Sequence, residues 1–228
     1  MRIAGLIAVS ALVAACSQSV GGQAGSPDPA GPTATTSPPT SSPAPTTPSG
    51  APAASSSIDD VVDWIEGGAP ADAASFHVAF RDGVTTRLGD DIAFVAASGA
   101  PHGTTQCVTA AAADGALTCL LDLTSPPPAP AQAEGMWKPG WVEFSGTALS
   151  VGALRGDPGP FGNGTGAELG TGRSLTFGDN RCRSDDTGLY CVNYAHRAAV
   201  RIAADGVVPF GCLAEAAPPP ETAVLFRC

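Results

Sequence analysis

The sequence is poor in basic residues, in aromatic residues and in charged residues altogether. Of its 228 residues, 11 are Lys or Arg against 21 Asp or Glu, which gives a formal net charge of -10 at pH 7. An acidic surface repels phosphate backbones, so we expect no binding of nucleic acid. The same charge gives no attraction to anionic lipid headgroups, so any attachment to a membrane must have another cause.

Three patterns are also missing from the chain. No strand–helix–strand alternation appears, which argues against a parallel α/β sheet. No apolar run reaches about 20 residues, the length that a transmembrane helix needs. No Cys-x-x-Cys motif or matching His spacing is present. The sequence therefore predicts neither a metal site nor another cofactor.

The first 15 residues predict a lipoprotein signal peptide. Arg2 is a short basic segment, and the stretch up to Ala15 is almost continuously apolar and ends in small residues. Val13-Ala14-Ala15 before Cys16 resembles the bacterial lipobox, at which the chain is cut and the cysteine is acylated. Each buried methylene contributes about 0.8 kcal/mol of membrane affinity, so two or more chains hold stably. We expect residues 1–15 to be removed and Cys16 to anchor the protein outside the cell membrane.

Residues 16–57 predict a tether, and residues 58–228 predict one extracytoplasmic domain. The tether is built from Pro, Ser, Thr, Ala and Gly with a single charge, Asp28. It cannot bury enough apolar surface to offset the entropy lost on ordering, so we expect it to be disordered. Its Thr/Pro clusters are of the kind that some bacteria O-glycosylate, and a bare tether is an equal interpretation.

One short amphipathic helix is predicted at the start of the domain. Apolar residues recur at i, i+3, i+4 and i+7 from Ile58, which places them on one helical face. Ser57 suits the N-cap, and Asp60 stands at the capping-box position. Gly67-Gly68 ends the helix. We expect this face to pack onto the rest of the domain, with Trp64 helping to cover the core.

The remainder of the domain predicts a mainly β fold, antiparallel and sandwich- or barrel-like, stapled by disulfides. Turn residues such as Asp82-Gly83 and Asp205-Gly206 separate the strands. Two stretches dense in Gly and Pro, 124–140 and 155–173, predict long loops. The predicted strands are Phe76–Arg81, Val84–Leu88, Ile92–Ala96, Gln106–Ala110, Ala116–Leu123, Trp141–Phe144, Leu149–Ala153, Ser174–Phe177, Arg181–Arg183, Leu189–Asn193, Ala199–Ile202 and Val207–Phe210.

Six cysteines remain for the domain, and an even number in an exported chain predicts disulfides. Among many possible pairings we favour neighbours in sequence: Cys107–Cys119, Cys182–Cys191 and Cys212–Cys228. Cys182 and Cys191 flank a predicted four-residue loop, 185–188, which sets them opposite each other within disulfide range. Each short bridge should add about 2–3 kcal/mol of stability. The first two cysteine hairpins also form a weak internal repeat.

Several stretches of the domain, together with the lipobox, resemble the LppI-type lipoproteins of mycobacteria. The second cysteine hairpin, through His196, is also similar to a broader secreted actinobacterial module. The resemblance implies an exported, lipid-anchored protein and brings no established reaction. The stretches that carry it are Val61-Val62-Asp63-Trp64-Ile65-Glu66, Arg81-Asp82-Gly83-Val84-Thr85-Thr86, Leu88-Gly89-Asp90-Asp91, Arg155-Gly156-Asp157-Pro158-Gly159-Pro160-Phe161, Phe177-Gly178-Asp179 and Cys191-Val192-Asn193-Tyr194-Ala195-His196.

Four residues are candidates for ligand binding: Trp137, Trp141, His196 and Arg201. Exposed aromatic residues beside a loop can bind sugars or apolar ligands, although buried core tryptophans are commoner. His196 follows a cysteine arm and has Arg201 nearby, but a general base needs a positioned partner, and a structural or surface histidine is the commoner case. No catalytic residue is predicted from a motif.

Two local motifs have plainer explanations. The stretch 148–152 mimics a nucleophile elbow around Ser150, but no helix follows it, and we expect Ser150 to be a strand residue. The glycine-rich stretch 162–166 lacks the strand and helix of a phosphate-binding loop, and we expect a flexible surface loop.

The sequence leaves three functions open. The first is a lipid-anchored, non-catalytic module that binds a ligand or protein of the cell envelope. The second is an extracytoplasmic hydrolase that uses His196 and a nearby carboxylate. The third is a structural envelope protein without a small ligand.

Overall fold

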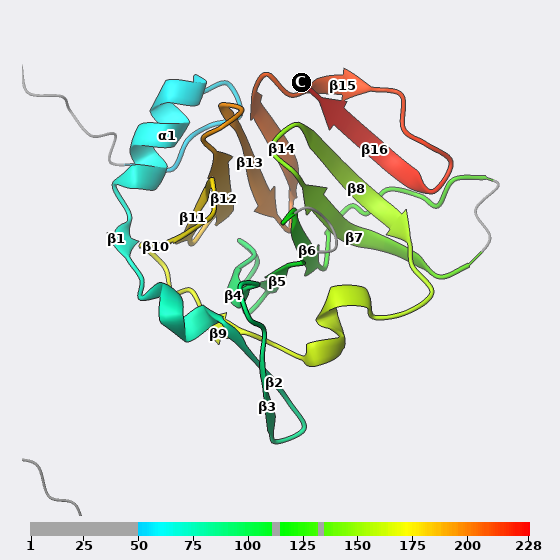
Figure 1. The fold of residues 1–228 in the computed structure, drawn as a ribbon. Coiled ribbons are helices and arrows are strands. Elements are labelled where there is room, and N and C mark those ends of the chain that lie inside the picture. Colours follow the sequence, from blue (N-terminus) through cyan, green and yellow to red (C-terminus); the bar gives the residue numbers. More distant parts are fainter. Residues whose placement is uncertain (1–49, 111–114, 132–134) are drawn as a thin grey trace, which may run out of the picture. The chain divides into compact units, whose positions relative to one another are not determined.

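The computed structural model describes residues 50–110, 115–131 and 135–228 of the chain (Figure 1). The predicted signal peptide, Cys16 and most of the predicted tether lie outside these residues. Contacts of the folded part extend N-terminal of the predicted start at residue 58. Ala51 packs against the domain, and the carbonyl oxygen of Pro52 accepts a hydrogen bond from the Tyr190 hydroxyl at 3.3 Å. None of the helices in the described ranges is both long and apolar enough to cross a membrane.

The described chain is mainly strand, with one α-helix. Its elements are α1 (Ile58–Glu66), β1 (Ala69–Pro70), η1 (Ala73–Phe76), β2 (Val78–Arg81), β3 (Val84–Arg87), β4 (Ala93–Ala97), β5 (Thr104–Thr109), β6 (Leu117–Leu121), β7 (Trp137–Phe144), β8 (Ala148–Leu154), η3 (Gly159–Asn163), β9 (Ala167–Glu168), β10 (Arg173–Phe177), β11 (Asn180–Asp185), β12 (Gly188–Asn193), β13 (Ala198–Ala203), β14 (Gly206–Gly211), β15 (Ala214–Ala216) and β16 (Thr222–Arg227).

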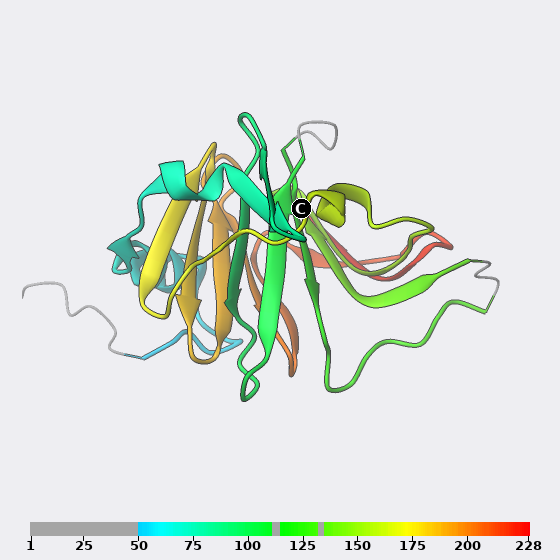
Figure 2. The same ribbon diagram turned by 90° about the horizontal axis from the view of Figure 1, so that it is seen from below.

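The strands form two large sheets and a separate hairpin. The six-stranded sheet has the order β1-β10-β11-β12-β13-β14, and the eight-stranded sheet has the order β15-β16-β8-β7-β6-β5-β4-β9. All neighbouring strands are antiparallel except the edge pairs β1–β10 and β4–β9. One core cluster joins the inner faces of both sheets, and both sheets have open edges. The fold is therefore a sandwich rather than a closed barrel, and Figure 2 shows the two sheets side by side.

Two of the three disulfides lie inside the sandwich, one on each sheet. Cys107 faces Cys119 across β5 and β6, and Cys182 faces Cys191 across β11 and β12, with Cα atoms 4.1 and 4.0 Å apart. All four cysteines are fully buried. The predicted pairing and the cross-strand geometry are confirmed. The expected four-residue loop is wrong, because Asp185 and Gly188 still pair and leave a tighter two-residue turn.

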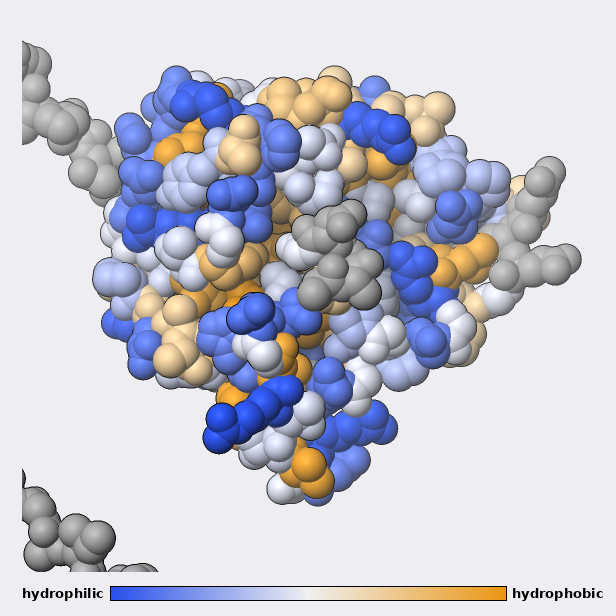
Figure 3. Space-filling model, in the orientation of Figure 1, coloured by the Kyte–Doolittle hydropathy of each residue, from blue (hydrophilic) through white to orange (hydrophobic). Residues whose placement is uncertain are grey.

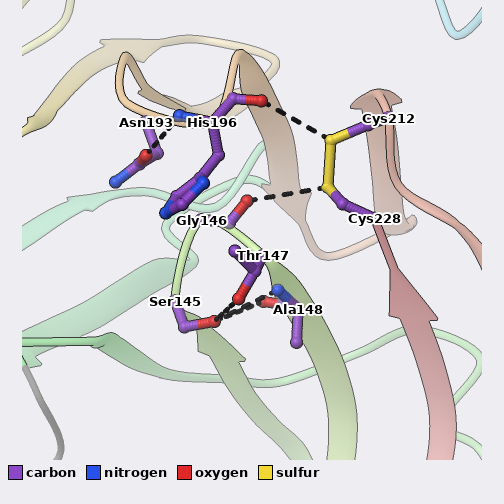
Figure 4. The surroundings of a disulfide bond; sticks show 8 residues. All are labelled: Ser145, Gly146, Thr147, Ala148, Asn193, His196, Cys212 and Cys228. Atoms are coloured by element: carbon purple, nitrogen blue, oxygen red, sulfur yellow. Dashed lines mark hydrogen bonds between the residues drawn. A yellow bond between two sulfur atoms is a disulfide. The ribbon is translucent and has the colours of Figure 1, made fainter.

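The third disulfide joins the two sheets at the surface. Cys212 follows β14 of the six-stranded sheet, and Cys228 follows β16 of the eight-stranded sheet. Figure 4 shows the bridge between two turns: the Cys212 sulfur lies 3.6 Å from the His196 carbonyl oxygen, and the Cys228 sulfur 3.8 Å from that of Gly146. Neither sulfur carries a proton, so these are packing contacts. The bridge ties the last residue of the chain to the opposite sheet.

Helix α1 covers the outer face of the six-stranded sheet. The Ser57 side chain accepts a hydrogen bond from the Asp60 backbone N–H at 3.1 Å, which confirms the predicted N-cap. Trp64, 2% exposed, packs on Tyr190 with ring centroids 4.7 Å apart. The Arg183 guanidinium lies 3.8 Å from the centre of the Trp64 ring, and burial lowers the pKa of Arg183 while Asp185 opposes that shift. The six-stranded sheet is therefore covered on both faces, by helix α1 on one side and by the eight-stranded sheet on the other.

The eight-stranded sheet has a less complete cover. The β2–β3 hairpin turns at Asp82-Gly83, both at positive φ, as a two-residue hairpin turn of type I′ requires. Its base covers Ala93 and Val108 through Ala79. The hairpin then projects from the body, where Figure 3 shows apolar and strongly polar residues side by side. The rest of this outer face stays partly open.

The two predicted loops are more ordered than expected. The predicted range of the first loop, 124–140, extends too far, because β7 begins at Trp137. The second, 155–173, contains η3 and β9. The expected loop at 162–166 is anchored to the domain: Thr165 bridges to Phe80, and a Cβ on Gly166 would lie 2.0 Å from the backbone of Ala93. Only glycine permits that approach of two backbones.

Candidate functional site

The four predicted ligand-binding residues do not share one site. Trp137 and Trp141 belong to β7, His196 lies in the turn between β12 and β13, and Arg201 lies on β13 of the other sheet. Of the four, Trp141 lines a cavity large enough for a small molecule. The other three make structural contacts within the domain.

His196 is exposed in the turn that packs beside the third disulfide (Figure 4). Its printed contacts are made by the backbone: the amide donates to the Asn193 side chain at 3.1 Å, and the carbonyl meets Cys212. Across the residues that the structure describes, no carboxylate oxygen lies within 4.0 Å of the His196 ring nitrogens. The expected pairing with a catalytic carboxylate has no support from this geometry.

Arg201 holds a turn together. Its Nε and Nη2 atoms donate to the Thr187 carbonyl oxygen at 3.1 and 2.7 Å, and its guanidinium lies 2.9 Å from Asp205. Thr187 belongs to the β11–β12 turn and Asp205 to the β13–β14 turn. The arginine is therefore committed to two hairpin ends of the six-stranded sheet.

Trp137 is wedged against β8. Its Nε1 atom donates to the Pro127 carbonyl oxygen at 3.3 Å. Its ring lies over Gly152, where a Cβ would come within 2.6 Å of the indole. Gly152 also has a φ of +76°, which a side chain rarely adopts. This indole is a packing element that needs a glycine beneath it.

The Trp141 cavity lies on the outer face of the eight-stranded sheet. Val142 and Phe144 of β7 point into the core, so Trp141 and Glu143 point outward. The strand register continues this outer row across the sheet, with Thr118 of β6 opposite Glu143 and Ser150 of β8 opposite Glu143 on the other side. The prediction that Ser150 is a strand residue is confirmed. A cavity of about 420 Å³ opens here, lined by Thr118, Trp141, Glu143, Arg155, Asp157 and Pro160 among others.

Arg155 is the charged centre of this cavity. Its Nη2 atom lies 2.5 Å from Glu143 Oε1, and the Trp141 Nε1 atom donates to the same oxygen at 2.7 Å. The guanidinium carbon lies 5.0 Å from the centre of the Trp141 ring. Phe161 packs edge-to-face with that indole, with ring centroids 5.3 Å apart. These contacts fix the guanidinium in place beside an apolar wall.

The cavity continues into a neighbouring groove of about 340 Å³, which shares Thr118, Glu143 and Arg155. The groove runs over Ser150 toward Glu221 and Arg227. Arg155 and Glu143 are each about one-third exposed, so both can meet a ligand without large rearrangement. Trp141 is only 3% exposed, so a ligand here meets the Arg155 guanidinium, the carboxylates of Glu143 and Asp157, and the apolar atoms of Pro160. Arg155 is the group in this lining that can bind the anionic group of a small organic molecule.

Arg155 and Glu143 were missed as site residues in the sequence. Arg155 is the first residue of a predicted long loop, and Glu143 has the sequence pattern of an ordinary solvent-facing strand residue. The contact between Arg155 and Glu143 depends on the path that the chain takes over β7 after the end of β8, and no local sequence pattern specifies that path. Comparisons with protein-family models, with curated proteins and with solved structures found no match, so the similarity to LppI-type lipoproteins stays a resemblance.

Proposed function

We propose that the protein is a lipid-anchored, extracytoplasmic binding module without catalytic activity, and that its ligand is a small organic anion. The lipobox before Cys16 supports the anchor. Three disulfides support an oxidising compartment outside the cytoplasm, since thiols in the cytoplasm are kept reduced. The ligand is expected to sit in the Trp141 cavity.

The observation that carries the binding role is the fixed guanidinium of Arg155. Glu143 and the Trp141 ring hold it from two sides inside a cavity of about 420 Å³. Pockets of about 300–1,000 Å³ are typical of small-molecule sites. A fixed arginine loses little conformational entropy when it binds an anion, which favours affinity. A purely structural envelope protein has no need of such a site.

The binding role can be tested with phenylacetate, which combines an aromatic ring with a carboxylate. The full chain is titrated in detergent and followed by ligand-observed NMR. We expect saturable binding of phenylacetate and clearly weaker binding of its neutral analogue, phenylacetamide. Arg155→Gln should weaken phenylacetate binding about tenfold, the effect of about 1.4 kcal/mol.

The matched control is Arg87→Gln, which removes an equal charge from an exposed position on β3. Its affinity for phenylacetate should equal that of the wild type. If Arg155→Gln and wild type bind phenylacetate equally, the Trp141 cavity is not the anion site.

The anchor has a separate test. Cys16→Ala should release the protein from the membrane fraction and leave the lipid-modified mass absent, while Ser17→Ala behaves as wild type. Equal retention of Cys16→Ala in membranes would contradict the proposed anchor without touching the proposed ligand site.

A further inference from the structure

A second cavity opens between the two sheets. It encloses about 490 Å³ and is formed by β4, the β4–β5 turn, β9 and the β11–β12 turn. The two turns meet here, since a Cβ on Gly99 would lie 2.9 Å from the Thr187 carbonyl oxygen. None of its lining residues lines the Trp141 cavity. It is therefore a separate site that the proposed anion binding does not use.

The charged groups that line this cavity are acidic. Glu168 of β9 and Asp186 of the β11–β12 turn contribute exposed carboxylates; His102 lies on the same wall, which contains neither Lys nor Arg. Asp186 accepts a hydrogen bond from the Thr171 hydroxyl at 3.0 Å. For Glu168, no ion pair or side-chain hydrogen bond to another described residue is found. One carboxylate is thus fixed by a neighbour and the other is available.

Ser184 supplies an independent observation. Its side chain is fully buried, and its hydroxyl has no hydrogen-bond partner among the described residues. On β11 it lies two residues after Cys182, whose side chain is in the core, so Ser184 points to the same face, into the space between the sheets. Ser184 belongs to the wall of the cavity that opens there. Buried hydroxyls are nearly always paired, so this one calls for a partner, which a water or a polar ligand atom would supply.

We propose that this cavity binds a small organic cation through a primary ammonium group. An ammonium has three N–H donors and no acceptor, which complements two carboxylates and a hydroxyl oxygen. Val95 and Ala97 of the wall, both partly exposed, provide apolar contact for an alkyl stem. A bare metal ion fits less well, because no three His, Cys, Asp or Glu side chains of the described chain gather closely enough to hold one.

The test uses pentylamine as the probe and pentanol as its neutral match, with the full chain in detergent and an amine-free buffer. Ligand-observed NMR should give saturable binding of pentylamine and at least tenfold weaker binding of pentanol. Glu168→Gln and Asp186→Asn should each weaken pentylamine binding about fivefold. Glu215→Gln is the matched control, because β15 lies at the opposite edge of the same sheet from β9. The affinity of the Glu215→Gln variant for pentylamine should equal that of the wild type.

Ser184→Ala separates a binding role from a structural one. It should weaken pentylamine binding about threefold and leave the melting temperature of the ligand-free protein unchanged or higher, because it removes an unpaired buried hydroxyl. The proposal is overturned if pentanol binds as well as pentylamine, or if Glu215→Gln weakens amine binding as much as Glu168→Gln and Asp186→Asn do. Arg155→Gln should leave amine binding intact, so this outcome is independent of the anion site.

Discussion

The two sheets of the sandwich differ in how their outer faces are covered. On the six-stranded sheet, β12 is buried at all six positions: Leu189 and Cys191 face the core, while Tyr190 and Val192 face helix α1. On the eight-stranded sheet, the outer faces of β7 and β8 carry Glu143 and Ser150 beside the Trp141 cavity and its neighbouring groove. The covered sheet supplies stability, and the open one retains polar groups that can meet a ligand.

The largest expected effect lies under the helix. Trp64→Ala should lower the free energy of unfolding by about 3–5 kcal/mol, because it leaves a cavity between α1 and Tyr190 and removes the surface on which Arg183 packs. Urea unfolding followed by circular dichroism measures it. A loss below about 1 kcal/mol would mean that the helix contributes little to stability and that the comparison between the two faces is wrong.

The disulfides sharpen the comparison between interior and surface. Cys212 and Cys228 are exposed, whereas the four other domain cysteines are fully buried. Mild reduction and alkylation should therefore label Cys212 and Cys228 first, as peptide masses can show. Replacing both by Ala should cost about 3 kcal/mol, since the bridge closes a loop of 16 residues in sequence separation. Earlier labelling of Cys182 or Cys191 would contradict the buried placement.

On the open face, stability should depend little on the charged pair. Arg155→Gln should change the free energy of unfolding by less than about 1 kcal/mol, because Arg155 and Glu143 are each partly exposed and surface ion pairs contribute little. The same variant is expected to bind phenylacetate about tenfold more weakly. Thermal unfolding measured beside Trp64→Ala gives the contrast directly. A comparable loss in both variants would show that the Trp141 cavity is chiefly structural.

The smallest effect concerns pH. Burial, followed by a 3.0 Å hydrogen bond to Glu66 and its charge, raises the pKa of Tyr194, although Arg181 opposes the shift. The unfolded chain loses this proton near pH 10 and the folded chain only above it, so stability should fall as pH rises past about 10. Tyr194→Phe should reduce that fall in unfolding experiments from pH 9 upward. An identical pH dependence in the variant would exclude Tyr194 as its source.

The sequence predicted the local structure well where one pattern sufficed. The helix, its N-cap, the turn at Asp82-Gly83 and the neighbouring cysteine pairs are all confirmed. Each depends on residues within about 16 positions of one another. It missed β15 and β16, which lie on either side of the prolines at 218–220, because β16 becomes a strand only beside β8, and β15 only beside β16.

The candidate site was predicted only in part. Trp141 was named, but its partners Arg155 and Glu143 were not, and Trp137, His196 and Arg201 serve other contacts. An indole that lines a cavity and one that fills a gap against glycine look alike in sequence. The difference arises from which strand or loop crosses over each ring.

By itself, the sequence determined the β-rich class, the amphipathic helix and the order of turns, and it favoured the cysteine pairing that the structure shows, because periodicity, turn chemistry and short loop closure act over few residues. The tertiary structure decided that there are two sheets rather than a barrel, which face remains open, and which polar groups surround each cavity. Those features depend on contacts between segments far apart in the chain, such as Gly166 against Ala93 and Ser184 in the space between the sheets, and such contacts form only when the whole domain closes.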